Sequence, residues 1–229
     1  MKIIDKNISN LQESFWDKFS SYLDDLSEKD KIYIWLSWWS SLNSFYEKIA
    51  KDFHSISNNI REKICFLFLD ERIVPLDNED SNYYQVNKTF LEKLKKENLI
   101  SEDQIIKIDY NSEDIAKDYS QKVWKIDIAL FWAWPDAHIA SLFPNHELLD
   151  SNKTSYLQIN NSPKPPSKRI TISPEMIKNI DFAFLFFIWE SKKDAFDKFL
   201  DENLTYKDCP AKLLKNANKS LIFSDIENF

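Results

Sequence analysis

Residues 32–53 read IYIWLSWWSSLNSFYEKIAKDF, and this stretch decides the fold class. Its first five residues form a short apolar run, which is typical of a strand buried on both faces. A serine-rich loop follows at 37–41, and Phe45, Ile49 and Phe53 then recur at helical spacing. A strand, a loop and a helix in this order predict one unit of a parallel sheet.

The same pattern returns along the chain. Apolar runs predict further strands at 64–69, 126–131 and 181–188. Helical spacing predicts helices at 11–26, 81–96 (with Ser81 as the N-cap), 112–123 and 191–200. The alternation predicts an α/β fold: a single domain over residues 1–229, with a mainly parallel sheet flanked by helices. Ligands of such a sheet bind beyond the carboxyl ends of its strands.

Composition excludes several classes of protein. A hydrophobic fraction of 43% and an aromatic fraction of 15% predict a packed core rather than a disordered chain. The net charge of -7 has the wrong sign for a protein that neutralises nucleic-acid phosphates, so we expect no nucleic-acid partner.

Targeting signals and cysteines point to the cytoplasm. The longest apolar run, residues 182–189, is too short to span a bilayer, and the first residues do not resemble a signal peptide. Cys65 and Cys209 form neither a disulfide framework nor a metal-ligand pattern. We therefore expect a cytoplasmic protein with no membrane partner, and the sequence makes no prediction of its oligomeric state.

A first polar cluster, Ser37-Trp38-Trp39-Ser40-Ser41, follows the strand at 32–36. Backbone N–H groups at a turn from strand to helix can bind an anion, and phosphate is the expected guest. The alternative is a serine-rich helix cap beside two aromatic core residues, which is the commoner role for such a sequence.

Two more clusters follow later strands. Arg72, in Asp70-Glu71-Arg72, has the planar fork that binds phosphate, although a surface ion pair is the usual role of such a triplet. His138, in the segment 132–144 (WAWPDAHIASLFP), is a candidate general base with Asp136 as its orienting carboxylate. A single histidine is more often structural, and we assign that role to the remaining two, His54 and His146.

Three blocks of sequence carry a resemblance to a known family. They are DERIVP at 70–75 with SNY at 81–83, PDAHIASLFP at 135–144, and SPKPPSKRIT at 162–171. Together they resemble the 6-phosphogluconolactonases, and the resemblance extends from the turn at Ser37 to Cys209-Pro210-Ala211. The ASLFP and SPKPP segments distinguish the chain from the glucosamine-6-phosphate deaminases of the same superfamily. From the residues alone, the proline-rich segment 162–166 is expected to be a rigid connection.

The resemblance implies a Rossmann-like fold and an enzyme that hydrolyses 6-phospho-D-glucono-1,5-lactone in the oxidative pentose phosphate pathway. It implies that His138 and Asp136 activate the attacking water, and that neither a metal nor an organic cofactor takes part. It assigns the phosphate to Ser37, Trp38, Trp39, Ser40, Arg72, Arg169 and Lys192. Two alternatives remain: an enzyme like glucosamine-6-phosphate deaminase, and a non-catalytic protein that binds sugar phosphates.

The chain contains no glycine and eight tryptophans, whereas average usage of about 7% would give roughly 16 glycines. The family has glycine at Ala137 and at five tryptophan positions: Trp38, Trp39, Trp132, Trp134 and Trp189. Glycine allows positive φ and close approach of a ligand to the backbone, and an indole allows neither. Our hypothesis is that the source organism reads the codon UGA as glycine, whereas the printed sequence is a translation in which UGA means tryptophan. An engineered glycine-free variant and a decayed homologue are the rival explanations.

Overall fold

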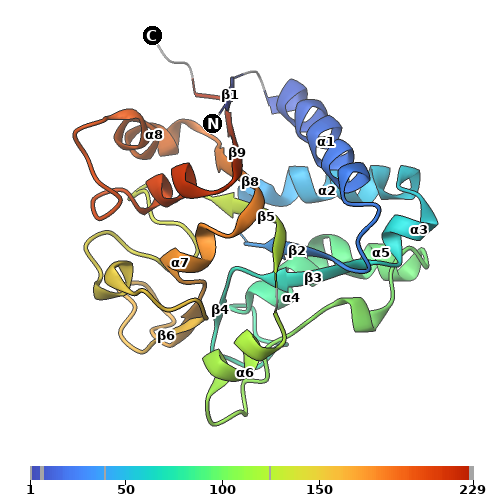
Figure 1. Ribbon diagram of the computed structural model, residues 1–229, viewed down its shortest axis with the longest axis horizontal. Helices are drawn as coiled ribbons and strands as arrows, with labels where there is room; N and C mark the ends of the chain where they lie inside the picture. Colours follow the sequence, from blue (N-terminus) through green and yellow to red (C-terminus); the bar gives the residue numbers. More distant parts are fainter. Residues whose placement is uncertain (1, 6–7, 39, 124, 227–229) are drawn as a thin grey trace.

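The computed structural model describes residues 2–5, 8–38, 40–123 and 125–226, so Trp39 and Trp124 lie outside the described residues. A six-stranded sheet forms its centre, in the order β1-β9-β8-β5-β2-β3, and every pairing in it is parallel (Figure 1). The strands are β1 (Lys2–Asp5), β9 (Lys219–Ser224), β8 (Ile180–Phe187), β5 (Ile126–Trp132), β2 (Ile32–Leu36) and β3 (Ile64–Phe68). The predicted α/β fold with a mainly parallel sheet is confirmed.

Both faces of this sheet are covered by helices, as a parallel sheet requires. Alternate strand residues belong to two separate cores: Ile34 and Phe66 to one, Trp35 and Leu67 to the other. The first core lies under α1 (Ile8–Asp25), α2 (Asn43–Asp52), α4 (Asn82–Val86) and α5 (Glu92–Lys96). The second lies under α6 (Ile115–Gln121) and α8 (Lys193–Leu200).

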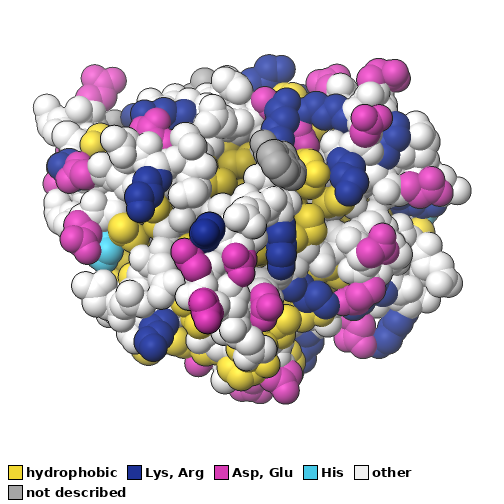
Figure 2. Space-filling view, turned by 60° about the horizontal axis from the view of Figure 1, so that its bottom comes forward, with side chains coloured by type: hydrophobic (Ala, Val, Ile, Leu, Met, Phe, Trp, Pro, Cys, Tyr) yellow, Lys and Arg dark blue, Asp and Glu magenta, His cyan; other side chains and the backbone are white. Residues whose placement is uncertain are grey.

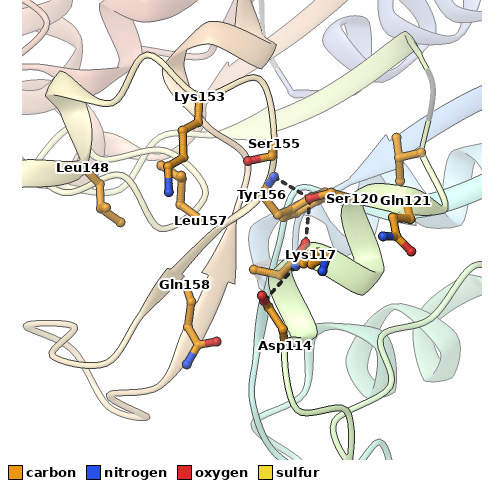
Figure 3. Close-up of a pocket in the computed structure, with 12 residues that line it drawn as sticks. Asp114, Lys117, Ser120, Gln121, Leu148, Lys153, Ser155, Tyr156, Leu157 and Gln158 are labelled. Carbon is orange, nitrogen blue, oxygen red and sulfur yellow. Dashed lines mark hydrogen bonds between the residues drawn. The ribbon is translucent and has the colours of Figure 1, made fainter.

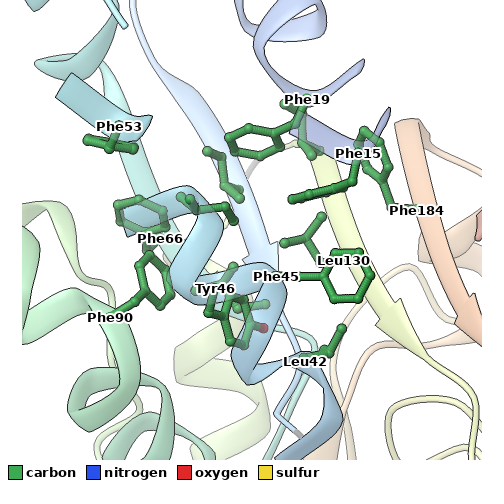
Figure 4. Packing of buried hydrophobic residues seen from close by; sticks show 14 of the residues in the cluster. Phe15, Phe19, Leu42, Phe45, Tyr46, Phe53, Phe66, Phe90, Leu130 and Phe184 are labelled. Carbon is green, nitrogen blue, oxygen red and sulfur yellow. The ribbon is translucent and has the colours of Figure 1, made fainter. Parts of the chain in front are cut away.

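Aromatic side chains dominate the first core. Figure 4 shows Phe15 and Phe19 of α1 and Phe45 of α2 beside Leu130 and Phe184 of the sheet. The ring centroids of Phe15 and Phe184 lie 5.3 Å apart at 81°, an edge-to-face contact. Burial of each such ring contributes about 1.5–3 kcal/mol relative to exposure.

A second, three-stranded sheet is antiparallel, in the order β4-β7-β6. Its strands are β4 (Asp70–Arg72), β7 (Arg169–Thr171) and β6 (Leu157–Ile159). The prediction that the chain enters a loop at Asp70 is wrong. These three charged residues have low strand propensity, but pairing with β7 satisfies their buried backbone. Register places Arg72 opposite Arg169.

The remaining boundaries agree with the sequence to within a few residues, with two differences. The helix predicted at 81–96 is interrupted by a π-helical segment, Asn87–Leu91, between α4 and α5. Short elements without clear periodicity were not predicted, including β1, β9, α3 (Asn58–Arg61) and α7 (Pro174–Ile177). β1 and β9, the first and last strands of the chain, pair side by side at one edge of the sheet (Figure 1).

Candidate active site

Asp136 and His138 form a hydrogen-bonded pair in the turn after β5. His138 Nδ1 lies 2.6 Å from Asp136 Oδ1, a distance at which the ring N–H donates to the carboxylate. The other ring nitrogen, Nε2, is then an acceptor, and it is buried with no hydrogen-bond partner among the described residues. The His138 side chain is 0% exposed and that of Asp136 is 40% exposed. Such a nitrogen can take a proton from a water molecule bound beside it.

The turn that carries this pair is fixed at both ends. Ala133 N–H donates to Phe186 O of the neighbouring strand at 3.1 Å, and Trp134 N–H donates to His138 O at 3.0 Å. Ala137 adopts φ 67° within the turn. The Phe143 ring packs against the imidazole, with its centroid 4.5 Å from that of the His138 ring. The imidazole therefore has a defined position before any ligand binds.

Burial and a lysine set the charges of the pair. Burial lowers the pKa of His138 to about 4, although the hydrogen bond and charge of Asp136 act to raise it. Burial acts to raise the pKa of Asp136, but hydrogen bonds and charges from His138 and Lys164 outweigh it and hold that pKa well below its usual range. Lys164 Nζ lies 2.8 Å from Asp136 Oδ2. Near neutral pH the imidazole is therefore uncharged and the carboxylate is ionised.

Lys164 was missed as a functional residue by the sequence reasoning. It lies in the SPKPP segment, whose prolines predict a rigid connection but whose lysine carries no periodic or spacing signal. The one available signal was its place inside a block that resembles the lactonases.

The two predicted phosphate-binding arginines lie opposite each other in the small sheet. Arg72 Nη1 donates to Asp80 O at 2.7 Å, and its buried Nε has no partner among the described residues. Arg169 donates to its own chain, at Ser141 Oγ and at three carbonyls of the segment 164–166. Burial, and then the charge of Arg72, lower the pKa of Arg169 to about 10.

A buried network joins these arginines to the turn of His138. Ser141 Oγ donates to Asp70 Oδ2 at 2.6 Å, and Ser141 N–H donates to Thr171 Oγ1 at 3.2 Å. Asn82 Nδ2 donates to Asp70 O at 2.7 Å. All three sequence blocks that carry the family resemblance are thus one connected unit around the end of β5.

Lys192 joins the same region from the segment after β8. Its side chain is buried, and its Nζ lies 5.3 Å from the centre of the Trp132 ring. Burial lowers the pKa of Lys192, the charge of Lys164 lowers it further, and Asp136 acts in the opposite direction. Arg72, His138 and Lys192, which come from three distant parts of the sequence, therefore lie around one site.

The predicted phosphate turn after β2 is described only in part. Ser37 Oγ donates to Leu130 O at 2.8 Å, and its carbonyl accepts a hydrogen bond from Tyr46 OH. Trp38 is half-buried, and Ser40 is exposed at the start of a 3₁₀ turn, Ser40–Leu42. Trp39 lies outside the described residues. The phosphate-binding role of this turn stays a prediction.

Trp189 has a backbone conformation that glycine adopts readily and other residues do not. Its φ is 76° and its ψ is 145°, and 48% of the residue is exposed. Trp132, by contrast, is fully buried with an indole N–H that has no acceptor among the described residues. Both positions are ones at which the family has glycine.

Two cavities lie away from the region around His138. One, of about 630 Å³, lies between α6 and the segment 148–158 (Figure 3), and the other, of about 610 Å³, lies at the opposite ends of the strands, beside Ile126 and Asn218. Neither lining includes a described residue that the sequence predicted for the site. Positive and negative side chains alternate over the face shown in Figure 2.

Searches of the described residues found no group of three or more His, Cys, Asp or Glu side chains arranged to hold a metal ion. Within the same residues, no helix is long and apolar enough to cross a membrane. The expected absence of a metal remains a prediction.

A parallel sheet whose central strand is followed by a hydrogen-bonded His–Asp pair, with buried arginines and a buried lysine nearby, has the layout of an α/β enzyme that binds its ligand beyond the carboxyl ends of the strands. The chain belongs to the family described as glucosamine-6-phosphate isomerases/6-phosphogluconolactonase, whose family model matches residues 6–223. The 6-phosphogluconolactonase of Borreliella burgdorferi is 33% identical over 225 residues, which cover 95% of this chain and 92% of that protein. The 6-phosphogluconolactonase 3 of Saccharomyces cerevisiae is 33% identical over 188 residues, covering 77% and 74% of the two chains.

Solved structures show the same fold. A 6-phosphogluconolactonase from Leishmania guyanensis aligns with a TM-score of 0.81 at 20% identity, covering 97% of this chain and 96% of that one. A monomeric glucosamine-6-phosphate deaminase aligns with a TM-score of 0.79 at 18% identity, covering 98% and 97%. Because both activities occur on this fold, the fold alone does not distinguish between them.

Proposed function

We propose that this protein hydrolyses 6-phospho-D-glucono-1,5-lactone to 6-phosphogluconate, as a step of the oxidative pentose phosphate pathway. One observation carries the proposal: the buried His138–Asp136 pair, whose Nε2 has no hydrogen-bond partner among the described residues. This pair lies in a chain that is 33% identical to a 6-phosphogluconolactonase over 95% of its length. The net charge of -7 supports a small-molecule substrate over nucleic acid, and we place the enzyme in the cytoplasm.

The chemistry follows from the two ring nitrogens. His138 Nε2 takes a proton from water as the water oxygen bonds to the lactone carbonyl carbon. Asp136, held at His138 Nδ1–H, stabilises the imidazolium that forms. When the tetrahedral intermediate collapses, the bond from the carbonyl carbon to the ring oxygen breaks. The ring oxygen then takes the proton from Nε2 and leaves as the sugar hydroxyl.

The remaining predicted residues are proposed to hold the phosphate. Arg72 and Lys192 are buried cations, and a phosphate bound by them would be held away from the reacting carbon. The turn from Ser37 to Ser40 would add backbone N–H groups. Arg169 is not included in this phosphate site, because its hydrogen bonds lie within the chain.

The identity of five residues bears directly on this function. We propose that Trp38, Trp39, Trp132, Trp134 and Trp189 stand where the natural protein has glycine. The conformation of Trp189 and the buried indole of Trp132 support this proposal. UGA codons at the five positions in the source gene, and glycine masses in peptides of the protein from its source, are the expected results. UGG codons would refute the recoding.

The test of activity uses two proteins, the printed chain and a chain with glycine at the five positions. Enzymatic hydrolysis of the lactone is measured as the rate above spontaneous hydrolysis, in a coupled assay that detects the oxidation of 6-phosphogluconate. The glycine-containing chain is expected to be active. A His138→Gln variant of that chain is expected to hydrolyse the lactone much more slowly. Release of ammonia from glucosamine 6-phosphate would favour the deaminase alternative, and binding without turnover would favour a sugar-phosphate sensor.

Binding tests the phosphate turn by itself. In calorimetric titrations with 6-phosphogluconate, the printed chain is expected to bind far more weakly than the glycine-containing chain, because two indoles at positions 38 and 39 obstruct the backbone N–H groups. Equal affinities would show that residues Ser37 to Ser40 do not bind the phosphate.

A further inference from the structure

Lys164 reaches the proposed catalytic pair from a distant loop. Asp136 is held at both carboxylate oxygens: Oδ1 by His138 at 2.6 Å and Oδ2 by Lys164 at 2.8 Å. Since 40% of the Asp136 side chain is exposed, the pair alone would leave its outer oxygen to solvent. A carboxylate bonded at both oxygens has one orientation, and that orientation directs Oδ1 at the imidazole.

The backbone of Lys164 is fixed at both of its polar groups. Its N–H donates to Ser162 Oγ at 3.2 Å, and Ser162 Oγ donates back to its carbonyl at 2.9 Å. Arg169 Nη2 also donates to the carbonyls of Lys164 and Pro165, at 3.0 and 2.9 Å, and Nε donates to that of Pro166 at 2.9 Å. A guanidinium that satisfies three consecutive carbonyls holds this loop in one conformation.

Arg169 also links the loop to the turn of His138. Its Nη1 donates to Ser141 Oγ at 3.2 Å, and Ser141 lies three residues beyond the imidazole. The residue is 2% exposed. Lys164 Nζ also lies 4.4 Å from the centre of the Trp134 ring, which stacks on the His138 imidazole at 4.9 Å, so variants of Lys164 are compared in chains with the same residue at position 134.

From this geometry we infer that Lys164 is a positioning residue for the His138–Asp136 pair, and that Arg169 acts by holding the Lys164 loop rather than by binding phosphate. The inference rests on the proposed lactone hydrolysis for its kinetic consequences. Its structural content, a lysine that orients the carboxylate of the pair, is independent of which reaction the pair performs.

The charged groups around His138 give the inference a measurable sign. After burial, Asp136 and Asp70 raise the pKa of the imidazole and Lys164 lowers it. Lys192 also faces Asp136 and Lys164. Removal of the Lys164 charge should therefore raise the pKa of His138, and we expect a shift of about one pH unit for a charge so close but partly exposed.

The experiment compares Lys164→Met, which is unbranched, uncharged and one atom shorter than lysine, with Lys164→Arg, which keeps the charge. In the active enzyme, we expect Lys164→Met to lower kcat roughly 10- to 100-fold, to change KM little, and to move the acid limb of the pH profile of kcat/KM upward by about one unit. Lys164→Arg should restore most of both. An unmoved acid limb in Lys164→Met would overturn the inference, even if activity fell.

A second measurement separates this inference from the proposed function. The chain has three histidines, and NMR titration of their imidazoles requires no substrate. The pKa of His138 should rise in Lys164→Met, and the signals of His54 and His146 serve as internal references. A protein that lacks lactonase activity but shows this shift would refute the function and keep the role of Lys164.

Arg169→Lys tests the role of the arginine, since it keeps the charge and loses the fork. A loop-holding role predicts a lower kcat, an acid limb that moves toward that of Lys164→Met, and a KM for the phosphorylated lactone within about threefold of the parent. A KM raised tenfold or more with kcat unchanged would show that Arg169 binds the phosphate and would overturn this part of the inference.

Discussion

Replacement of Trp189 by glycine is expected to stabilise the protein relative to alanine, which reverses the ordinary order of the two residues. The backbone of Trp189 is held at φ 76° and ψ 145° because its N–H donates to Asp225 Oδ1 at 2.7 Å and its carbonyl accepts from Lys192 N–H at 2.9 Å. Any residue with a Cβ carries strain of about 1–3 kcal/mol in this region, and glycine does not.

The magnitude follows from three contributions. Glycine loses about 0.4–1 kcal/mol relative to alanine because its unfolded chain is more flexible. Both variants lose the half-exposed indole and its contact with the Trp132 ring, 6.5 Å away, so this loss cancels between them. The remaining difference favours glycine by about 1–2 kcal/mol, or roughly 2–8 °C in Tm for a chain of this size.

Chemical and thermal unfolding of Trp189→Gly and Trp189→Ala measure this difference directly. A matched pair at an exposed helix site with negative φ, Lys18→Gly and Lys18→Ala, supplies the ordinary order, in which alanine is the more stable. The same order at position 189 would refute the argument from strain and would remove the structural support for a natural glycine there.

Four further outcomes are expected. His138→Gln should lower kcat about 10²- to 10⁴-fold in the coupled lactone assay with little change in Tm. In the parent enzyme, kcat/KM should fall as the pH falls through about 4, because burial lowers the pKa of His138 to that value and the protonated imidazole cannot accept a proton. An acid limb near pH 6.5 would contradict this assignment. Glu71→Ala should destabilise the fold by on the order of 3 kcal/mol in urea unfolding, since the backbone N–H groups of residues 72, 82 and 83 lose their buried acceptor; an effect under 1 kcal/mol would show that water replaces the carboxylate. Ala137→Gly should raise the free energy of unfolding by up to about 1 kcal/mol by relieving φ 67°, and a loss of stability would show that this turn tolerates the alanine.

The sequence predicted the central sheet because hydrophobic burial on both faces leaves a continuous apolar run. β2, β3, β5 and β8 all have this pattern, and their predicted bounds agree with the structure to within one residue. The strand β4 could not be predicted in this way, because three consecutive charged residues resemble a loop. Their burial depends on groups from distant segments, such as Ser141 for Asp70. Such compensation is a tertiary effect with no local signal.

The candidate site was predicted in part for the same reason. Asp136 and His138 are two residues apart after a clear strand, so their contact follows from the local sequence. Lys164 joins them from 26 residues further along the chain. Its approach depends on a loop held by Arg169, and the sequence supplies no rule for that geometry. Arg169 itself illustrates the limit, since the family resemblance assigned it to the phosphate whereas its hydrogen bonds in the structure are to Ser141 Oγ and to backbone carbonyls.

The loop that carries Lys164 also bears on the choice between hydrolysis and deamination. Lactonase and deaminase structures share this fold, so the fold itself does not determine which of the two reactions occurs. The SPKPP segment at 162–166 is one that distinguishes this chain from the deaminases by sequence resemblance; it supplies Lys164, and Arg169 follows three residues after it. A base for water must be uncharged before the reaction and still be able to hold a proton during it. Asp136 favours the charged imidazole, whereas burial and then the charge of Lys164 oppose it; His138 and Lys164 together keep the carboxylate ionised. The lysine therefore permits one carboxylate to stabilise the imidazolium in the transition state without protonating the base beforehand.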